Sequence, residues 1–183
     1  MTLIRVIINE EDSPPLRAIV GHLEALEELD ELSAMIGYAT QYSDEKKLLR
    51  YISEPQSFRQ EVQVPPLLVR RIHLGSPLEL LLQHISMFGT TFLGLLSLAS
   101  NRPYRNSLVT LNKSRASFID ATTNYVNVQV AMILASSPEV RAAYMQITGR
   151  LPIIAADEVD KIEPSAHEDR EDPQDSEDRQ DEA

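Results

Sequence analysis

Residues 80–101 limit the possible folds of this chain more than any other segment, because they contain no Lys, Arg, Asp or Glu. A run this long and apolar is stable only when it is buried in a protein core, against another chain or in a lipid bilayer. As a helix, residues 80–100 would measure about 31 Å, close to the thickness of a bilayer core. Residues 85–100, the cleanest apolar part, have a length more typical of a buried helix than of a membrane span.

The sequence that leads into this segment, RRIHLGSPLE, has the features of a helix start. Gly75 permits a tight turn, Ser76 can cap a helix, and Pro77 suits the first helical position. Glu79 could complete a capping box with Ser76. We therefore expect an apolar helix over residues 77–100.

An anion site at the same junction is the functional alternative. A helix N-terminus offers free amide groups, and cationic side chains beside it would add positive charge. The residues of this site would be Arg70, Arg71, His73, Gly75 and Ser76. In a regular strand, however, Arg70 and Arg71 point to opposite faces, which counts against the site. No glycine-rich phosphate loop follows, so we favour the purely structural interpretation.

Small residues recur within the expected helix at a spacing that permits close helix packing. Ser86, Thr90 and Gly94 are four residues apart, and Ser97 falls near the same face. Such residues let two helix backbones approach closely. The pattern fits a helical hairpin, a homo-oligomer or a membrane bundle.

A basic stretch follows the apolar segment directly. Arg102, Arg105, Lys113 and Arg115 give residues 80–119 a net charge of +4, with no acidic residue. A basic flank after an apolar helix is what an anionic membrane surface favours. A membrane-associated effector that inserts residues 80–100 is therefore one of our two hypotheses for function.

The first 75 residues are typical of a small α/β unit. Residues 3–9 are rich in Ile and Val and predict a covered strand rather than a secretion signal. A helix is expected after Ser13, which can act as its cap, with Gly37 as its stop. A shorter helix is expected over residues 43–52, with Ser43 as its cap. Strands are expected over residues 58–64 and 67–74, around a proline turn.

The second half is expected to be mainly helical. Residues 107–135 combine a seven-residue apolar repeat with a short Val alternation, so that helix and strand both fit, and we favour helix. Ser137, Pro138 and Gly149 bound a further helix. After Ile154 apolar residues become rare, and the sequence is typical of a disordered acidic tail.

Almost all of the net charge of −11 belongs to this tail. Residues 157–183 hold 13 Asp and Glu and 3 Lys and Arg, a net charge of −10, which leaves −1 for residues 1–156. A nearly neutral body with 5% aromatic residues argues against nucleic-acid binding. The absence of Cys excludes disulfides and thiol catalysis and fits a cytoplasmic protein.

No catalytic or metal-binding motif is present in the sequence. The four His residues are not paired at metal-ligand spacing, and no nucleophile-elbow motif occurs. The acidic cluster of Glu27, Glu28, Asp30 and Glu31 is interpreted as a solvated helix face. We therefore predict no cofactor and no metal. The lack of a motif favours a non-enzymatic protein but leaves open a catalytic site built from distant residues.

The sequence thus predicts an α+β protein with a small N-terminal α/β unit, a mainly helical C-terminal half and a disordered acidic tail. The expected segments are 1–75, a helical hairpin or bundle over 76–150, and a linker and tail over 151–183. The first hypothesis for function is a non-enzymatic interaction or regulatory module. It would self-associate or bind a protein partner through its apolar helical region.

Overall fold

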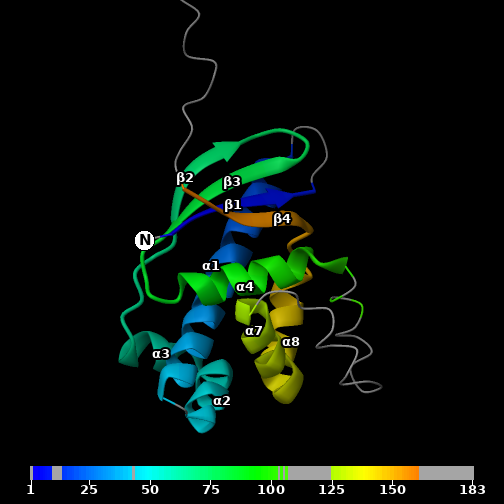
Figure 1. The fold of residues 1–183 in the computed structure, drawn as a ribbon. Coiled ribbons are helices and arrows are strands. Elements are labelled where there is room, and N and C mark those ends of the chain that lie inside the picture. The colour runs from blue at the N-terminus through cyan, green and yellow to red at the C-terminus, as the bar shows by residue number, and fades with distance from the viewer. Residues whose placement is uncertain are drawn as a thin grey trace, which may run out of the picture.

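A computed structural model of the chain describes residues 2–9, 14–42, 44–102, 104, 106 and 125–160. In these residues the protein has an α+β fold, a four-stranded antiparallel sheet packed on a group of helices (Figure 1). The strands follow the order β2-β3-β1-β4 and comprise β1 (Thr2–Ile8), β2 (Leu68–His73), β3 (Leu78–His84) and β4 (Ile153–Val159). The helices are α1 (Leu16–Tyr42), α2 (Glu45–Ser53), α3 (Pro55–Glu61), α4 (Gly89–Ser100), α7 (Tyr125–Ser136) and α8 (Pro138–Thr148).

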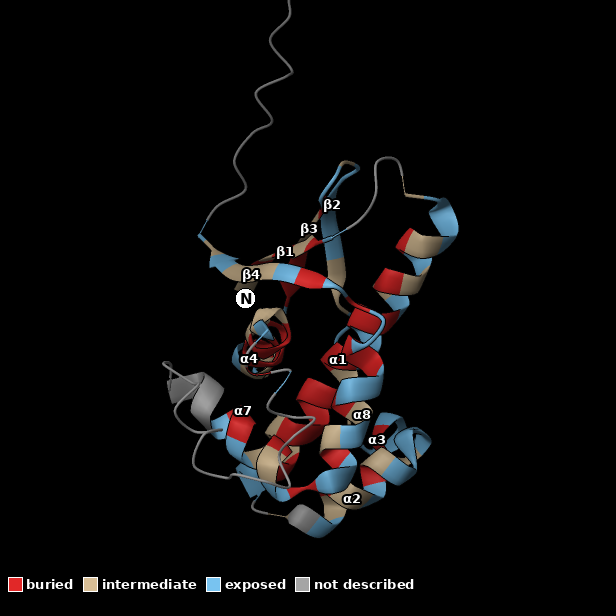
Figure 2. Ribbon diagram, turned by 90° about the vertical axis from the view of Figure 1, so that its right-hand side faces the viewer, coloured by how far each residue is buried: buried red, intermediate tan, exposed pale blue. Residues whose placement is uncertain are grey.

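One face of the sheet forms the core together with α4 and α1. In β1, Ile4, Val6 and Ile8 are fully buried, whereas the residues between them are half-buried. This is the period of two that a strand with one covered face requires. Helix α4 contacts β4, β1 and α1, and the described helices all lie on this side of the sheet (Figure 2).

The expected helix over residues 77–100 is wrong in its first part. Residues 78–84 form β3, which pairs with β1 and β2, and the helix begins only at Gly89. Ser76 therefore caps no helix, and Glu79 lies in the sheet opposite Ile7 of β1. The error has a physical reason: Leu81 interrupts the alternation of Leu78, Leu80 and Leu82 with Glu79 and Gln83. The resulting short run of Leu also fits a buried helix.

Several other predictions need correction. Residues 55–61 form α3 and residues 62–67 continue without regular structure, so the strand over 58–64 is wrong. Helix α1 continues past Gly37 to Tyr42. The cap of α2 is Asp44, whose side chain accepts a hydrogen bond from the Lys47 amide at 3.0 Å. Residues 153–159 of the expected linker and tail form β4, which pairs with β1.

The remaining predicted elements are confirmed where the structure describes them. Strands occupy most of residues 3–9 and 67–74, and α8 follows Ser137, whose side chain accepts a hydrogen bond from the Val140 amide. Helix α7 confirms the preference for helix over residues 125–135, whereas residues 107–124 lie outside the described residues. The division at residues 75 and 150 stays a prediction, although strands from all three segments pair in one sheet.

Candidate functional site

Strand β2 is the most exposed element of the sheet. It is an edge strand, and β3 is its only partner among the described residues. The side chains of five consecutive residues, which we call the β2 edge, are exposed: Val69, Arg70, Arg71, Ile72 and His73. Edge strands present backbone donors and acceptors to their surroundings, and natural sheets usually protect them.

A β-bulge brings Arg70 and Arg71 to one side of the sheet. The register shifts between Val69 and Arg71, so that Arg71 lies opposite Leu81 and Arg70 is the extra residue. The Arg70 guanidinium donates to the side-chain oxygen of Gln83, which lies two residues from Leu81 on the same face. The expectation that the two Arg side chains point to opposite faces is therefore wrong, because that rule assumes a regular strand.

The face that carries these two Arg residues is the one opposite α4, and we call it the open face. Within it, Arg5 of β1 binds Asp157 of β4, with contacts of 2.8 and 3.3 Å between the guanidinium and the carboxylate. His73 lies opposite Glu79 in the neighbouring strand. None of the described helices lies on this face (Figures 1 and 2). Its strongest concentration of positive charge is at β2.

The opposite side of β2 is apolar. Val69 and Ile72 lie opposite Leu82 and Leu80, on the side of the sheet that elsewhere packs on the helices. They are nevertheless 42% and 40% exposed. Strand β2 thus has a basic side and an apolar side, both accessible.

No helix begins at the predicted anion site, because residues 78–84 form β3 and α4 begins at Gly89. Gly75 and Ser76 lie in the turn between β2 and β3, and the Ser76–Pro77 peptide bond is cis. No helical amides are therefore offered at this junction. Arg70, Arg71 and His73 remain close together, but on a strand.

The predicted helix-packing face is divided between different environments. Ser86 precedes α4, Thr90 is exposed, Gly94 is buried and Ser97 is half-buried. Of the predicted basic patch, Arg102 is exposed, whereas Arg105, Lys113 and Arg115 lie outside the described residues. None of the helices described is long and apolar enough to cross a membrane.

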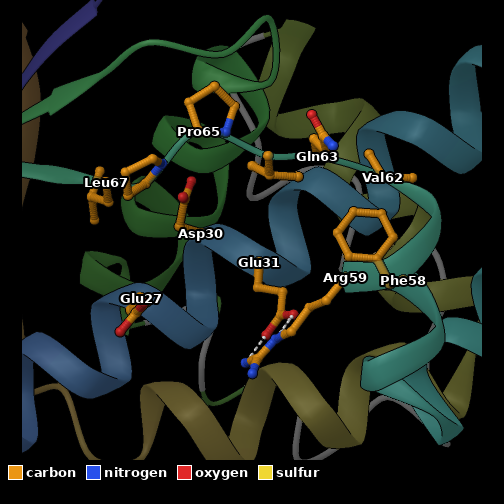
Figure 3. Close-up of a pocket in the computed structure, with 11 residues that line it drawn as sticks. Glu27, Asp30, Glu31, Phe58, Arg59, Val62, Gln63, Pro65 and Leu67 are labelled. Atoms are coloured by element: carbon orange, nitrogen blue, oxygen red, sulfur yellow. Dashed lines mark hydrogen bonds and ion pairs between the residues drawn. The ribbon is translucent and has the colours of Figure 1, made fainter.

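A groove of about 560 Å³ lies between α1 and residues 58–67. Its α1 wall carries Glu27, Asp30 and Glu31, and the facing segment contributes mainly apolar side chains (Figure 3). Arg59 crosses the groove to bind the Glu31 carboxylate with contacts of 2.6 and 2.8 Å. The one cation among the described residues that line the groove is thus already paired.

Asp30 is buried, contrary to the prediction of a solvated acidic face. Its carboxylate lies 2.5 Å from Nε2 of His84 in β3, and His84 stacks on Phe92 of α4. On the other side of the ring, Nδ1 is 3.4 Å from the Ser86 hydroxyl, which accepts a hydrogen bond from the Phe88 amide. The sequence signal for the burial of Asp30 was its position one residue after Leu29 and four after Leu26, within the apolar stripe of α1.

The contacts from Asp30 to His84 and from His84 to Ser86 resemble the acid, base and nucleophile of a catalytic triad. Their geometry, however, is that of a packing contact. The 3.4 Å separation exceeds the range for an activated hydroxyl. Ser86 also does not line the groove between α1 and residues 58–67. We therefore interpret these three contacting side chains as a structural connection between β3, α1 and the start of α4.

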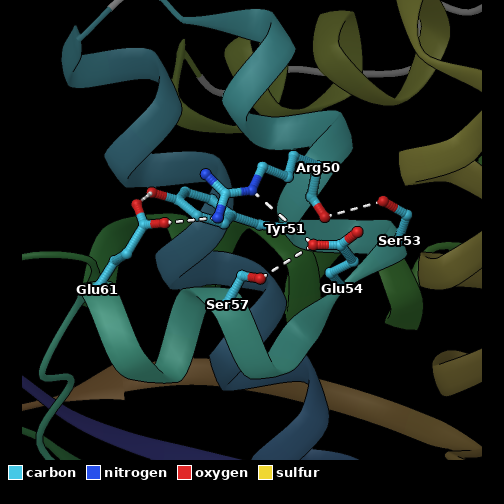
Figure 4. A network of polar contacts seen from close by, with 6 residues as sticks. All are labelled: Arg50, Tyr51, Ser53, Glu54, Ser57 and Glu61. Carbon is cyan, nitrogen blue, oxygen red and sulfur yellow. Dashed lines mark hydrogen bonds and ion pairs between the residues drawn. The ribbon is translucent and has the colours of Figure 1, made fainter.

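A second polar cluster connects α2 and α3 (Figure 4). The buried Tyr51 hydroxyl donates to Glu61 at 2.7 Å, and Arg50 binds the same carboxylate at 2.9 Å. Burial and the Glu61 carboxylate raise the pKa of Tyr51 to about 12. The hydrogen bond from Tyr51 in turn lowers the pKa of Glu61. These contacts stabilise the helical end of the molecule, far from the sheet.

Among the described residues, no group of three His, Asp or Glu side chains is arranged to hold a metal ion. Comparison of the chain with protein-family models, curated proteins and solved structures finds no match.

Proposed function

We propose that this protein is a non-enzymatic interaction or regulatory module that binds an extended segment of a partner protein along β2. The partner segment would add a fifth strand to the sheet, with main-chain hydrogen bonds to the β2 backbone. The single observation that carries the proposal is an edge strand whose side chains are exposed on both sides.

The chemistry of β2 supports selective rather than general strand pairing. Charged side chains and bulges on an edge discourage unspecific association of sheets. On β2 these same features, Arg70 and Arg71, favour a partner that carries negative charge on one side. Val69 and Ile72 favour apolar side chains on the other side. A strand that alternates acidic and apolar residues matches both.

The charges of β2 make a heterotypic partner a better candidate than a second copy of the chain. A symmetric antiparallel pair of β2 strands, centred on Leu68–His73, would place Arg70 of one copy opposite Arg71 of the other. Like charges directly opposite each other are destabilising in a sheet. Self-association through this edge is therefore disfavoured.

The apolar segment that first suggested an interface has a different role in this proposal. Leu80, Leu82, Leu95 and Leu98 are buried in the protein core. These are the side chains that a membrane-associated effector would have to present to lipid. Their burial supports the interaction module over the membrane alternative.

The proposal is tested by placing a charge on the apolar side of β2. Ile72→Lys should abolish recovery of a protein partner in affinity purification, because it buries an ammonium group against the added strand. Met145→Lys in α8 is the matched control, since Met145 is 38% and Ile72 40% exposed. Both changes are expected to alter folding stability by no more than about 0.5 kcal/mol. Recovery of the same partner by the Ile72→Lys variant would contradict the proposal.

A further inference from the structure

We propose that the acidic segment 161–183 of the same chain docks on the open face beside β2 and competes there with the partner. This inference rests on the proposed function of the β2 edge. It names the segment that occupies the surface when no partner is bound. Three observations carry it: where the segment begins, how far it extends, and its charge.

The segment begins at the end of the sheet where Arg70 lies. Val159 of β4 is opposite Leu3 of β1, Leu3 is opposite Gln83 of β3, and Gln83 is opposite Leu68 of β2. These four residues form one row across the open face. The Arg70 guanidinium reaches this row through its hydrogen bond to Gln83. Residues 161–183 therefore follow β4 at the end of the sheet where the Arg70 guanidinium lies.

The length of the segment is sufficient to reach β2. Neighbouring strands are about 4.8 Å apart, so β2 lies roughly 14 Å from β4 across the sheet. Glu168, where the densest acidic stretch begins, is eight residues beyond Asp160. Eight extended residues span about 26 Å. Residues 165–172, which lie between Pro164 and Pro173, are also long enough to run along the six residues of β2.

The charge of the segment is complementary to the β2 end of the open face. Residues 161–183 hold 10 Asp and Glu and 3 Lys and Arg, a net charge of −7. On the open face, Glu79 and Asp157 oppose an acidic ligand, and Arg5 is already bound to Asp157. The bulge places the positive charges of Arg70 and Arg71 together at the β2 end of this face. The acidic stretch should settle at β2 rather than over β4.

A tethered segment competes effectively even when its intrinsic affinity is low. For a tether of this length the effective concentration at β2 is on the order of millimolar. The affinity of a partner falls in proportion to the fraction of molecules in which β2 is covered. The docked acidic segment would thus raise the partner concentration needed to occupy β2. When the segment leaves β2, the partner would bind with its full affinity.

The test uses the full chain and a single spin label, which is possible because the sequence contains no Cys. Ser176→Cys places the label 16 residues beyond Asp160, within reach of β2, and the salt dependence and the paired Arg variants distinguish docking from chance encounters. We expect paramagnetic broadening of the amide signals of residues 68–73 and none in α2. The broadening should disappear in about 1 M salt, where the Debye length is about 3 Å.

Two paired variants identify the surface. Arg70→Gln/Arg71→Gln should remove the broadening, whereas Lys46→Gln/Lys47→Gln, which also removes two adjacent cations but from α2, should preserve it. Absence of broadening at β2 in the parent protein, or broadening around Arg102 in its place, would overturn the inference. The measurement needs no partner. Loss of the partner by Ile72→Lys without any broadening would therefore refute the docked segment and leave the proposed function standing.

Discussion

His84 of β3 and Asp30 of α1 lie 2.5 Å apart, Nε2 to Oδ1, and both side chains are almost completely buried. The contact joins the sheet to the longest helix across the core. Breaking a buried pair leaves one polar group without compensation, which is costly. Asp30→Ala or His84→Ala should therefore lower the free energy of unfolding by about 3–5 kcal/mol in urea titrations.

A double-mutant cycle distinguishes this pair from two independent core positions. The Asp30→Ala/His84→Ala variant should be less destabilised than the sum of the single variants by about 0.5–3 kcal/mol. Glu27→Ala, an exposed change on the same helix, should stay within about 0.5 kcal/mol of the parent. Strictly additive effects would mean that the two side chains do not interact in solution.

Gly37 and Gly21 offer a matched pair of glycines within α1. A Cβ at Gly37 would overlap the Phe88 ring, whereas a Cβ at Gly21 would have no neighbour within 4 Å. Gly21→Ala should stabilise the protein by about 0.5–1 kcal/mol, because Gly is unfavourable in a helix interior. Gly37→Ala should destabilise it by about 1–3 kcal/mol through overpacking. Thermal unfolding of both variants checks the opposite signs.

The hydrogen bond from Tyr51 to Glu61 predicts a loss of stability at high pH. The pKa of Tyr51 is about 12 in the folded protein and about 10 when unfolded. Its contribution is therefore complete below pH 10 and is lost as the pH rises from about 10 to 12. Tyr51→Phe should remove this part of the alkaline decline and cost about 1 kcal/mol at neutral pH. Parallel alkaline curves for both proteins would exclude Tyr51 as the cause.

The ion pair between Arg5 and Asp157 is expected to contribute little. Its side chains are 44% and 42% exposed, so solvent screens the attraction. Arg5→Gln should cost at most about 1 kcal/mol in low salt, and the difference should shrink as salt is added. Arg17→Gln, which removes an exposed charge from α1, serves as the reference. A decrease in the free energy of unfolding of more than about 2 kcal/mol would mean that the ion pair contributes strongly to holding β1 and β4 together.

Local sequence patterns predicted the elements in which one interpretation clearly dominated. The Ile and Val run of β1 and the caps of α8 are examples, since each specifies its backbone conformation within a few residues. Of the covers that the uncharged segment could have, the protein core is the one that most of its Leu side chains have, whereas Ile85 and Met87 are exposed. The segment's conformation was not predictable, because β3 becomes a strand only through pairing with β1 and β2, which lie elsewhere in the sequence.

The candidate site shows the same limit. The sequence singled out Arg70, Arg71 and His73, but placed the Arg side chains on opposite faces and beside a helix. The bulge that unites them is a property of the β2–β3 register, which depends on two strands at once. The burial of Asp30 likewise depends on His84, 54 residues away.

By itself, the sequence determined that most apolar side chains of residues 80–101 would be covered, that acidity would collect in the last segment, and near which residues α1, α2 and α8 would begin. These properties follow from composition and local hydrogen bonding, which act over a few residues. Only the tertiary structure decided which apolar residues became β3 and why α1 continues past Gly37. It also exposed the two sides of β2. Each of these depends on backbone pairing and close packing between distant segments, whose energy no single stretch of sequence contains.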